Sequence, residues 1–281
     1  MGMPLATGSM TMKNPQSGKI QRDFAMKCNW PLSALLLLAL LSVGTACPAN
    51  AQDGSSEAQQ KQWAEQIQET TRLLTQVKLD GAEQIALLSK RGDAHFFTGQ
   101  FAKAVADYDR MLVADPTLKT SHWRRGIALY FTGQFQDAAD QFEAYHSFDN
   151  VDRENGIWRY LCLYRAQGKA AAQATLLKYE KDDRAPFPLV YQLFEGKLTV
   201  EQLQAEFAKQ TLSPQQRVSQ EFYLFLYLGF FEQAEGHPKT ALEALEKSVK
   251  NPWPQKAGYG PHYMWQVGRL ERDRLLAPHK K

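Results

Sequence analysis

A stretch of this sequence repeats itself at an interval of 34 residues, and this spacing restricts the fold more than any other feature. Residues 90–101 are matched by residues 124–135. The same offset relates two pairs of glycines, a pair of alanines and a pair of aromatic residues: Gly92 and Gly126, Gly99 and Gly133, Ala104 and Ala138, Tyr108 and Phe142. A repeat of this length with a glycine in its middle is typical of a helix–turn–helix unit that buries its apolar face by stacking on its neighbours. The sequence therefore predicts an all-α solenoid.

The small residues of each unit stand where its two helices are expected to touch. Gly92 and Gly126 have no side chain, so the second helix of the unit can approach the first closely. The alanine of each unit is expected to face this glycine from the second helix. The later glycine of each unit is expected to adopt the backbone angles of the turn between the helices. These three positions are predicted to be structural in both repeats.

The two units resemble tetratricopeptide repeats (TPRs), which place small and aromatic residues at these positions of a helical hairpin. The first unit also closes with Asp115-Pro116, as TPRs do. A wider similarity, which includes the helices around Trp158 and Phe222, is to the NlpI-type lipoproteins, a family of exported bacterial TPR proteins. This resemblance implies an adaptor that binds a protein partner such as an envelope protease or a peptidoglycan hydrolase.

Helical spacing of apolar residues continues along the rest of the chain. Two clear repeats and two degenerate hairpins are expected to form the solenoid over residues 82–275, at about residues 85–118, 119–152, 153–183 and 218–252. Residues 52–80 are predicted to be a linker and a first helix, which Asp80-Gly81 is expected to end. The last helix, from about Tyr263 to Leu276, is expected to cover the open end of the solenoid.

Residues 1–51 have the composition of an N-terminal extension with an export signal. Met26 is the expected true start, residues 32–43 are apolar or small, and residues 49–51 offer a site for signal peptidase. Lipidation of Cys47 is the alternative, because small residues precede this cysteine, and it would anchor the protein to a membrane. Both interpretations predict export to the periplasm or cell envelope of a bacterium.

Charge and motif content argue against two classes of function. Basic and acidic residues balance outside the N-terminal segment and form no Lys/Arg run, so no nucleic-acid partner is expected. The sequence has no HExxH, CxxC, GxSxG or phosphate-binding GxxxxGK pattern, so we expect no catalytic site, metal or cofactor and predict that the protein is not an enzyme. Glu221, Glu232 and Glu235 are interpreted as the solvated face of one helix.

The first helix of each unit is expected to line a concave groove for a protein or peptide partner. The candidate groove residues combine aromatic rings with charged groups, and they are Asp93, Phe97, Arg124, Tyr130 and Phe131. Rings suit apolar anchors of a peptide, and the guanidinium suits a carboxylate or a backbone carbonyl. Two alternatives stay open: the rings belong to the core, or the same surface makes the protein a self-associating, dimeric spacer.

Overall fold

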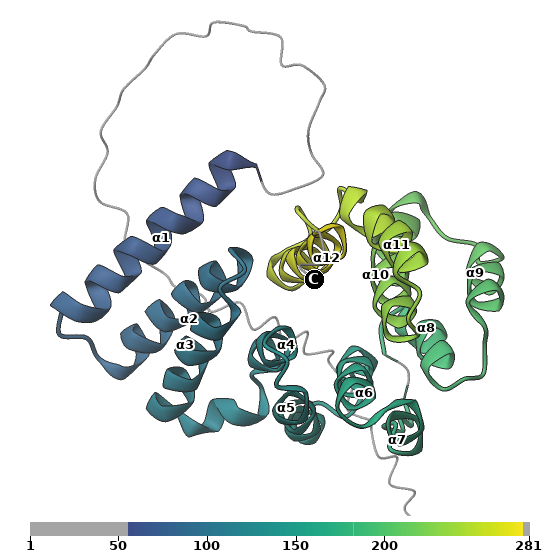
Figure 1. The fold of residues 1–281 in the computed structure, drawn as a ribbon, viewed down its shortest axis with the longest axis horizontal. Coiled ribbons are helices and arrows are strands. Elements are labelled where there is room, and N and C mark those ends of the chain that lie inside the picture. Colours follow the sequence, from purple (N-terminus) through teal and green to yellow (C-terminus); the bar gives the residue numbers. More distant parts are fainter. Residues whose placement is uncertain (1–55, 182, 278–281) are drawn as a thin grey trace, which may run out of the picture. The chain divides into compact units, whose positions relative to one another are not determined.

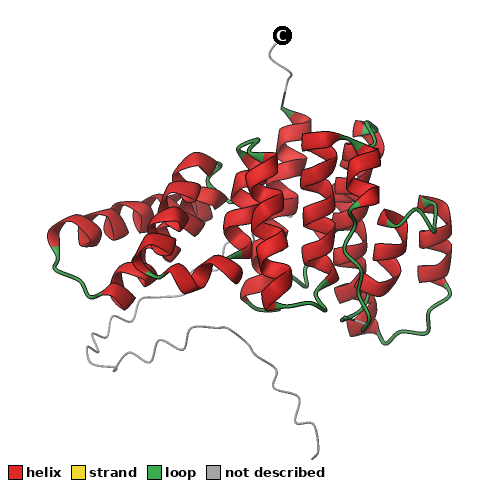
Figure 2. Ribbon diagram, turned by 90° about the horizontal axis from the view of Figure 1, so that it is seen from below, coloured by secondary structure: helices red, strands yellow, loops and turns green. Residues whose placement is uncertain are grey.

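The computed structural model describes residues 56–181 and 183–277, and the candidate signal segment with Cys47 lies outside the described residues. The described residues are helical and contain no strand (Figure 2). Their α-helices are α1 (Glu57–Gln76), α2 (Gly81–Phe97), α3 (Phe101–Ala114), α4 (Trp123–Phe131), α5 (Phe135–Phe148), α6 (Arg153–Gln167), α7 (Lys169–Ala174), α8 (Phe187–Phe194), α9 (Val200–Ala208), α10 (Pro214–Ala234), α11 (Pro238–Lys250) and α12 (Tyr259–Leu276). A 3-10 helix, Pro116–Thr120, joins α3 to α4. The expected all-α class is confirmed.

Several helices begin at a residue whose side chain caps the first turn. Ser56, Thr199 and Ser213 cap α1, α9 and α10 in reciprocal pairs with a glutamine three residues later. Asp80 does the same for α2 with Glu83, since Asp80 Oδ1 accepts a hydrogen bond from the Glu83 backbone N–H at 2.8 Å. The expectation that Asp80-Gly81 ends the first helix is therefore wrong, because this pair begins the second helix.

Glycine closes the helix before the turn in three hairpins. Gly99, Gly133 and Gly236 have φ angles of +75°, +81° and +84°, a region that side chains rarely allow. In each turn the amide after the glycine donates to the carbonyl five residues earlier, as Gln100 N–H does to His95 at 2.8 Å. These are Schellman turns, and they satisfy carbonyls that the end of a helix leaves unpaired. The positive φ angles of Gly99 and Gly133 thus agree with their predicted role in the turns.

The close contacts within three hairpins share one arrangement, in which a glycine of the first helix faces a large residue of the second. A Cβ added to the glycine would lie 2.5–2.7 Å from that residue, and the pairs are Gly92 with Tyr108, Gly126 with Phe142 and Gly229 with Leu245. Ala104 and Ala138 are fully buried but are not among the nearest atoms to these glycines. The expected glycine–alanine contact is therefore corrected: the glycine makes room for a ring.

The C-terminal helix lies on the inner side of the curved row formed by α2 to α6 (Figure 1). The Tyr263 ring of α12 stacks on Phe96 of α2 with centroids 5.1 Å apart, and it meets Trp123 of α4 edge-on at 4.9 Å. Gly268 allows α12 to approach Leu226 of α10, because a Cβ there would lie 2.9 Å from the leucine. The helix was expected to cover the open end of the solenoid, but it fills the inside of the row.

The third hairpin is incomplete, because its second helix, α7, has only six residues. The chain then runs irregularly to α8, and side chains hold its backbone in place. The Arg153 guanidinium donates a hydrogen bond to the Lys181 carbonyl at 2.6 Å, and the Tyr191 hydroxyl donates one to the Leu177 carbonyl at 2.7 Å. The short α7 leaves an open space beside α8 and α10, and the candidate site lies there.

Candidate functional site

The aromatic rings predicted for the groove are buried, two of them against the C-terminal helix and Tyr130 against Trp158 and Phe230. Phe97, Tyr130 and Phe131 are 7%, 3% and 7% exposed. The Phe97 ring packs against Tyr263 of α12 with centroids 5.2 Å apart, and the Phe131 ring lies under the Arg274 guanidinium. The rings were predicted to line an open groove, and the structure corrects this expectation because α12 occupies the space.

The charged groups predicted for the groove are also engaged by the chain. Arg124 Nη1 lies 2.8 Å from Asp93 Oδ1 and 2.8 Å from the Tyr259 hydroxyl of α12. The Asp93 carboxylate also accepts hydrogen bonds from the hydroxyls of Tyr108 and Tyr259, at 2.7 and 2.6 Å. Burial opposes the charge of Arg124, but the adjacent Asp93 carboxylate raises its pKa well above the ordinary value. The pair is therefore an internal ion pair that fixes the start of α12.

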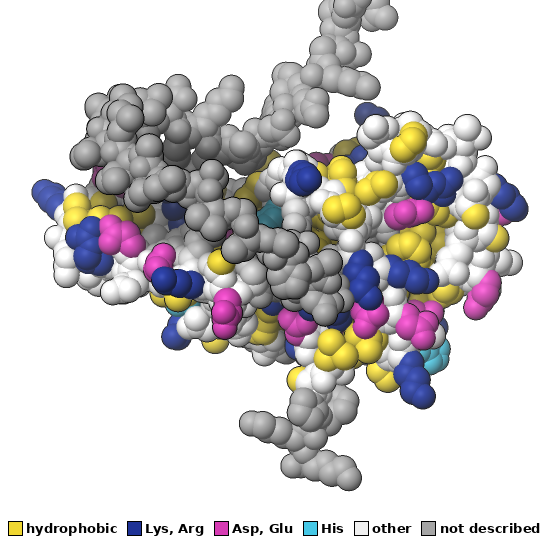
Figure 3. Space-filling view, turned by 90° about the horizontal axis from the view of Figure 1, so that it is seen from above, with side chains coloured by type: hydrophobic (Ala, Val, Ile, Leu, Met, Phe, Trp, Pro, Cys, Tyr) yellow, Lys and Arg dark blue, Asp and Glu magenta, His cyan; other side chains and the backbone are white. Residues whose placement is uncertain are grey.

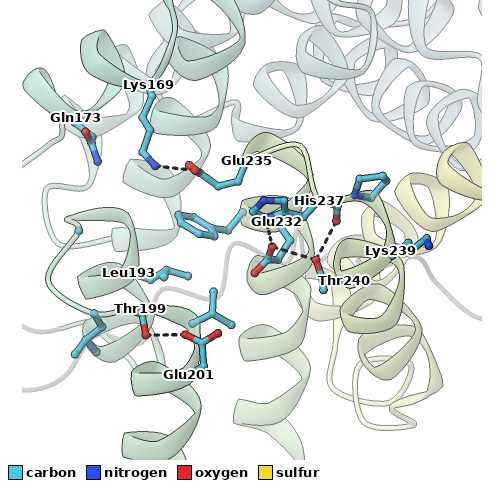
Figure 4. Close-up of a pocket in the computed structure, with 15 residues that line it drawn as sticks. Lys169, Gln173, Leu193, Thr199, Glu201, Glu232, Glu235, His237, Lys239 and Thr240 are labelled. Atoms are coloured by element: carbon cyan, nitrogen blue, oxygen red, sulfur yellow. Dashed lines mark hydrogen bonds and ion pairs between the residues drawn. The ribbon is translucent and has the colours of Figure 1, made fainter.

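A cleft of about 730 Å³ opens on the other side of the molecule, between α7, the α8–α9 connection and the turn from α10 to α11 (Figure 4). We call it the α9/α10 cleft, and its lining includes Lys169, Gln173, Leu193, Leu198, Val200, Glu201, Phe231, Glu232, Glu235, His237, Lys239 and Thr240. In Figure 1, α9 stands beside α8 at the edge of the fold, and α10 and α11 lie next to this pair. The walls therefore come from segments that are far apart in the sequence.

Local turn chemistry places the residues of the α9 wall. Gly196 has a φ of +71° and ends α8, so the chain turns back toward the cleft at Leu198. Thr199 then caps α9: its backbone N–H donates to Gln202 Oε1 at 2.9 Å, and its side chain accepts from the Gln202 N–H at 3.2 Å. This cap sets Glu201 in the first turn of α9, where a carboxylate is favoured by the helix dipole.

The α10 wall carries two glutamates that are largely shielded from solvent. The Glu232 side chain is 12% exposed, and its Oε2 lies 2.8 Å from His237 Nδ1 and accepts a hydrogen bond from the Thr240 hydroxyl at 3.1 Å. The Glu235 side chain is 18% exposed and pairs with Lys169 of α7 at 2.7 Å. The prediction that Glu232 and Glu235 form a solvated face is therefore wrong, because α7 and α11 pack beside the end of α10.

The carboxylates of the two walls differ in what surrounds them. Hydrogen bonds from its own backbone N–H and from the Thr199 hydroxyl lower the pKa of Glu201, so this exposed group stays ionised at neutral pH. Glu235 is neutralised by Lys169. Glu232 Oε1 has no hydrogen-bond partner among the described residues, although Oε2 of the same group has two.

The polar groups of the cleft are arranged for recognition. The Thr240 hydroxyl is directed to Glu232 Oε2 at 3.1 Å and to the His237 backbone carbonyl at 3.0 Å, and not to the His237 imidazole, so the three residues do not form a nucleophile paired with a base. Within residues 56–181 and 183–277, no three His, Cys, Asp or Glu side chains are grouped so as to hold a metal ion. What the cleft offers a ligand is an apolar floor with charged and hydrogen-bonding groups at its rim.

A second charged cluster lies at the start of α6. The Arg184 guanidinium pairs with Glu154, with Asp152 at 3.5 Å and with Asp183 at 3.3 Å, and the Tyr227 hydroxyl donates a hydrogen bond to Glu154. Burial raises the pKa of Glu154 to about 7 and that of Asp152 to about 6, while Arg184 opposes both changes. One guanidinium thus faces three carboxylates, and this imbalance makes the cluster sensitive to pH.

No model of a known protein family matches the chain. The resemblance to TPRs, from the internal repeat, and to NlpI-type lipoproteins, from the wider order of helices, therefore stays a prediction from the sequence. None of the described helices is both long and apolar enough to cross a membrane. On the face shown in Figure 3, basic and acidic side chains are interspersed.

Proposed function

We propose that the protein is a scaffold of TPR-like helical hairpins that binds a segment of a protein partner in the α9/α10 cleft. The observation that carries the proposal is an open, apolar-floored cavity of about 730 Å³ whose rim holds charged groups. Ligand sites in proteins are typically concave, largely apolar and on the order of 300–1,000 Å³. The inner face of the row of hairpins is a weaker candidate, because α12 packs against Phe97 and Phe131, and Tyr130 is buried against Trp158 and Phe230.

The cleft suits a peptide segment better than a folded surface. Leu198 and Val200 are half-buried on one wall, and Phe231 is half-buried on the other, so apolar surface stays available inside a concavity. An extended segment or one helical turn can place an apolar side chain between these walls. Removing such surface from water contributes about 25 cal/mol for each Å² that is buried.

The location of this scaffold is part of the proposal. The apolar run and the small residues at 49–51 favour export. The similarity to the NlpI-type family then favours a partner in the bacterial cell envelope, such as a protease or a peptidoglycan hydrolase. In this proposal the protein contributes no chemistry of its own and holds the partner in place.

The proposal is tested by a crosslink that starts in the cleft. A photoreactive amino acid replaces the exposed Gln173, the crosslinked partner is identified by mass spectrometry, and binding of the purified partner is measured by calorimetry. We expect Leu198→Ala to weaken binding by about fivefold or more, since it removes part of an apolar pocket. Leu276→Ala, which changes an exposed leucine at the end of α12, is the matched control and should bind like wild type.

Circular dichroism and the melting temperature establish that both variants are folded. A purified partner that binds a folded Leu198→Ala protein as tightly as wild type would refute the assignment of the cleft.

A further inference from the structure

We propose that the α9/α10 cleft selects a peptide segment in which a large apolar side chain is flanked by Lys or Arg. This inference rests on the proposed function and adds the chemistry of the ligand. It follows from three properties of the cleft: its apolar floor, the placement of its carboxylates and the way in which its own cations are used.

The floor of the cleft requires an apolar anchor in the ligand. Leu193 is buried at the end of α8, and Leu198, Val200 and Phe231 are half-buried around it. The floor therefore presents aliphatic and aromatic surface, and no charged group of the ligand could be hydrogen-bonded there. A buried polar group without a hydrogen-bond partner is destabilising, so a polar side chain is disfavoured at this point.

Carboxylates on both walls require a cation beside this anchor. Glu201 lies in the first turn of α9 on one wall, Glu232 lies near the end of α10 on the other, and Figure 4 shows both flanking the space between the walls. Glu201 is held in the ionised form by its hydrogen bonds. Glu232 has a free carboxylate oxygen in a largely shielded position, where a hydrogen bond from a charged donor is strong.

Neither lysine of the cleft is paired with Glu201 or Glu232. Lys169 is paired with Glu235 at 2.7 Å. Lys239 points away from Glu201 and Glu232 in Figure 4. The His237 imidazole lies 2.8 Å from Glu232 Oε2, and Glu232 Oε1 is left available. The carboxylates of Glu201 and Glu232, which no lysine of the cleft neutralises, therefore favour Lys and Arg over Asp and Glu in a ligand.

Fluorescence polarisation with three labelled peptides tests the inference on the full chain. The peptides share their length and backbone and carry Lys-Leu-Leu-Arg, Glu-Leu-Leu-Glu or Lys-Ser-Ser-Arg at their centre. We expect the first to bind at least about tenfold more tightly than either of the others, since both the anchor and the charge are needed.

Variants in which a glutamate is replaced by glutamine show which carboxylates contribute to peptide binding. We expect Glu201→Gln and Glu232→Gln each to weaken the Lys-Leu-Leu-Arg peptide by about threefold to tenfold. The control is Glu206→Gln on the same helix, α9, where the carboxylate is exposed outside the cleft and pairs with Lys209. Each variant keeps the size of the side chain, so folding is little affected, and thermal melting verifies this.

The possible results separate the inference from the proposed function. If the Glu-Leu-Leu-Glu peptide binds more tightly than the Lys-Leu-Leu-Arg peptide, and Leu198→Ala reduces its binding, the inferred ligand chemistry is overturned. The proposed function, a cleft that binds a peptide, then still stands. If Glu206→Gln weakens binding of the Lys-Leu-Leu-Arg peptide as much as Glu201→Gln does, the inference is also overturned, because the peptide is then attracted by negative charge outside the cleft as well. If no peptide binds, or if Leu198→Ala changes none of the affinities, the inference and the proposed function both fail.

Discussion

Replacing Gly126 with alanine tests the close packing between the two helices of a repeat. A Cβ at this position would lie 2.7 Å from Cζ and 2.8 Å from Cε2 of Phe142. The ring cannot easily move away, because it is 1% exposed and lies nearly parallel to Trp158 with centroids 6.1 Å apart. A single methyl group therefore has to displace part of the core between α4, α5 and α6.

Two opposing effects set the size of the change. Alanine is favoured over glycine in a helix interior by about 1 kcal/mol. Overpacking a well-filled core costs about 1–3 kcal/mol. We therefore expect Gly126→Ala to lower the free energy of unfolding by about 1 kcal/mol, and Gly126→Leu to lower it by about 2–4 kcal/mol, since a longer side chain displaces more of the core.

Urea unfolding followed by circular dichroism measures these free energies. Gly260→Ala is the control, because a Cβ at this position in the first turn of α12 meets no atom within 4 Å, and no loss is expected. In a Phe142→Ala background the space is open, so Gly126→Ala should become neutral or stabilising. A Gly126→Ala protein as stable as wild type, or one whose penalty persists without the ring, would refute the reasoning.

Two further predictions concern pH and export. The folded-state pKa of Glu154, about 7, lies above its ordinary value of 4.5, so this group contributes stability that is fully present below about pH 4.5 and is lost as the pH rises through 7. We therefore expect wild type to lose stability relative to Glu154→Gln by on the order of 2 kcal/mol between pH 4.5 and 8. Urea unfolding of both proteins across this range measures the difference, and a difference that does not change with pH would contradict the prediction. N-terminal sequencing of the exported protein should begin at Gln52, whereas a lipid-modified Cys47 would reverse this prediction and place the protein on a membrane.

Local features of the sequence predicted the elements and their turns. Gly99 and Gly133 were predicted to form the turns of their hairpins, and both close their helices with positive φ. Such signals depend on the backbone of a few neighbouring residues, so they can be recognised without knowing the fold. Asp80 shows their limit, because the same residue type suits the end of one helix and the cap of the next, and only the hydrogen bond with Glu83 decides between them.

The location of the candidate site could not be predicted in this way. Arg124 and the rings beside it have the composition of a peptide groove, and this composition suits equally well a surface that packs against α12. Glu232 and Glu235 have the spacing of an exposed helix face. They are shielded only because Lys169 and His237, which belong to other elements, lie beside them.

The sequence by itself determined the helices, their turns and the glycines that let hairpins close, because each depends on residues near one another in the chain. The tertiary structure alone decided which concave surface is filled and which is open. The Tyr259 hydroxyl reaches Asp93 across 166 positions of sequence, and no local pattern encodes this contact. Once α12 is buried against α2 and α4, apolar surface is left accessible in a concavity at the α9/α10 cleft, where the short α7 fails to cover α8 and α10.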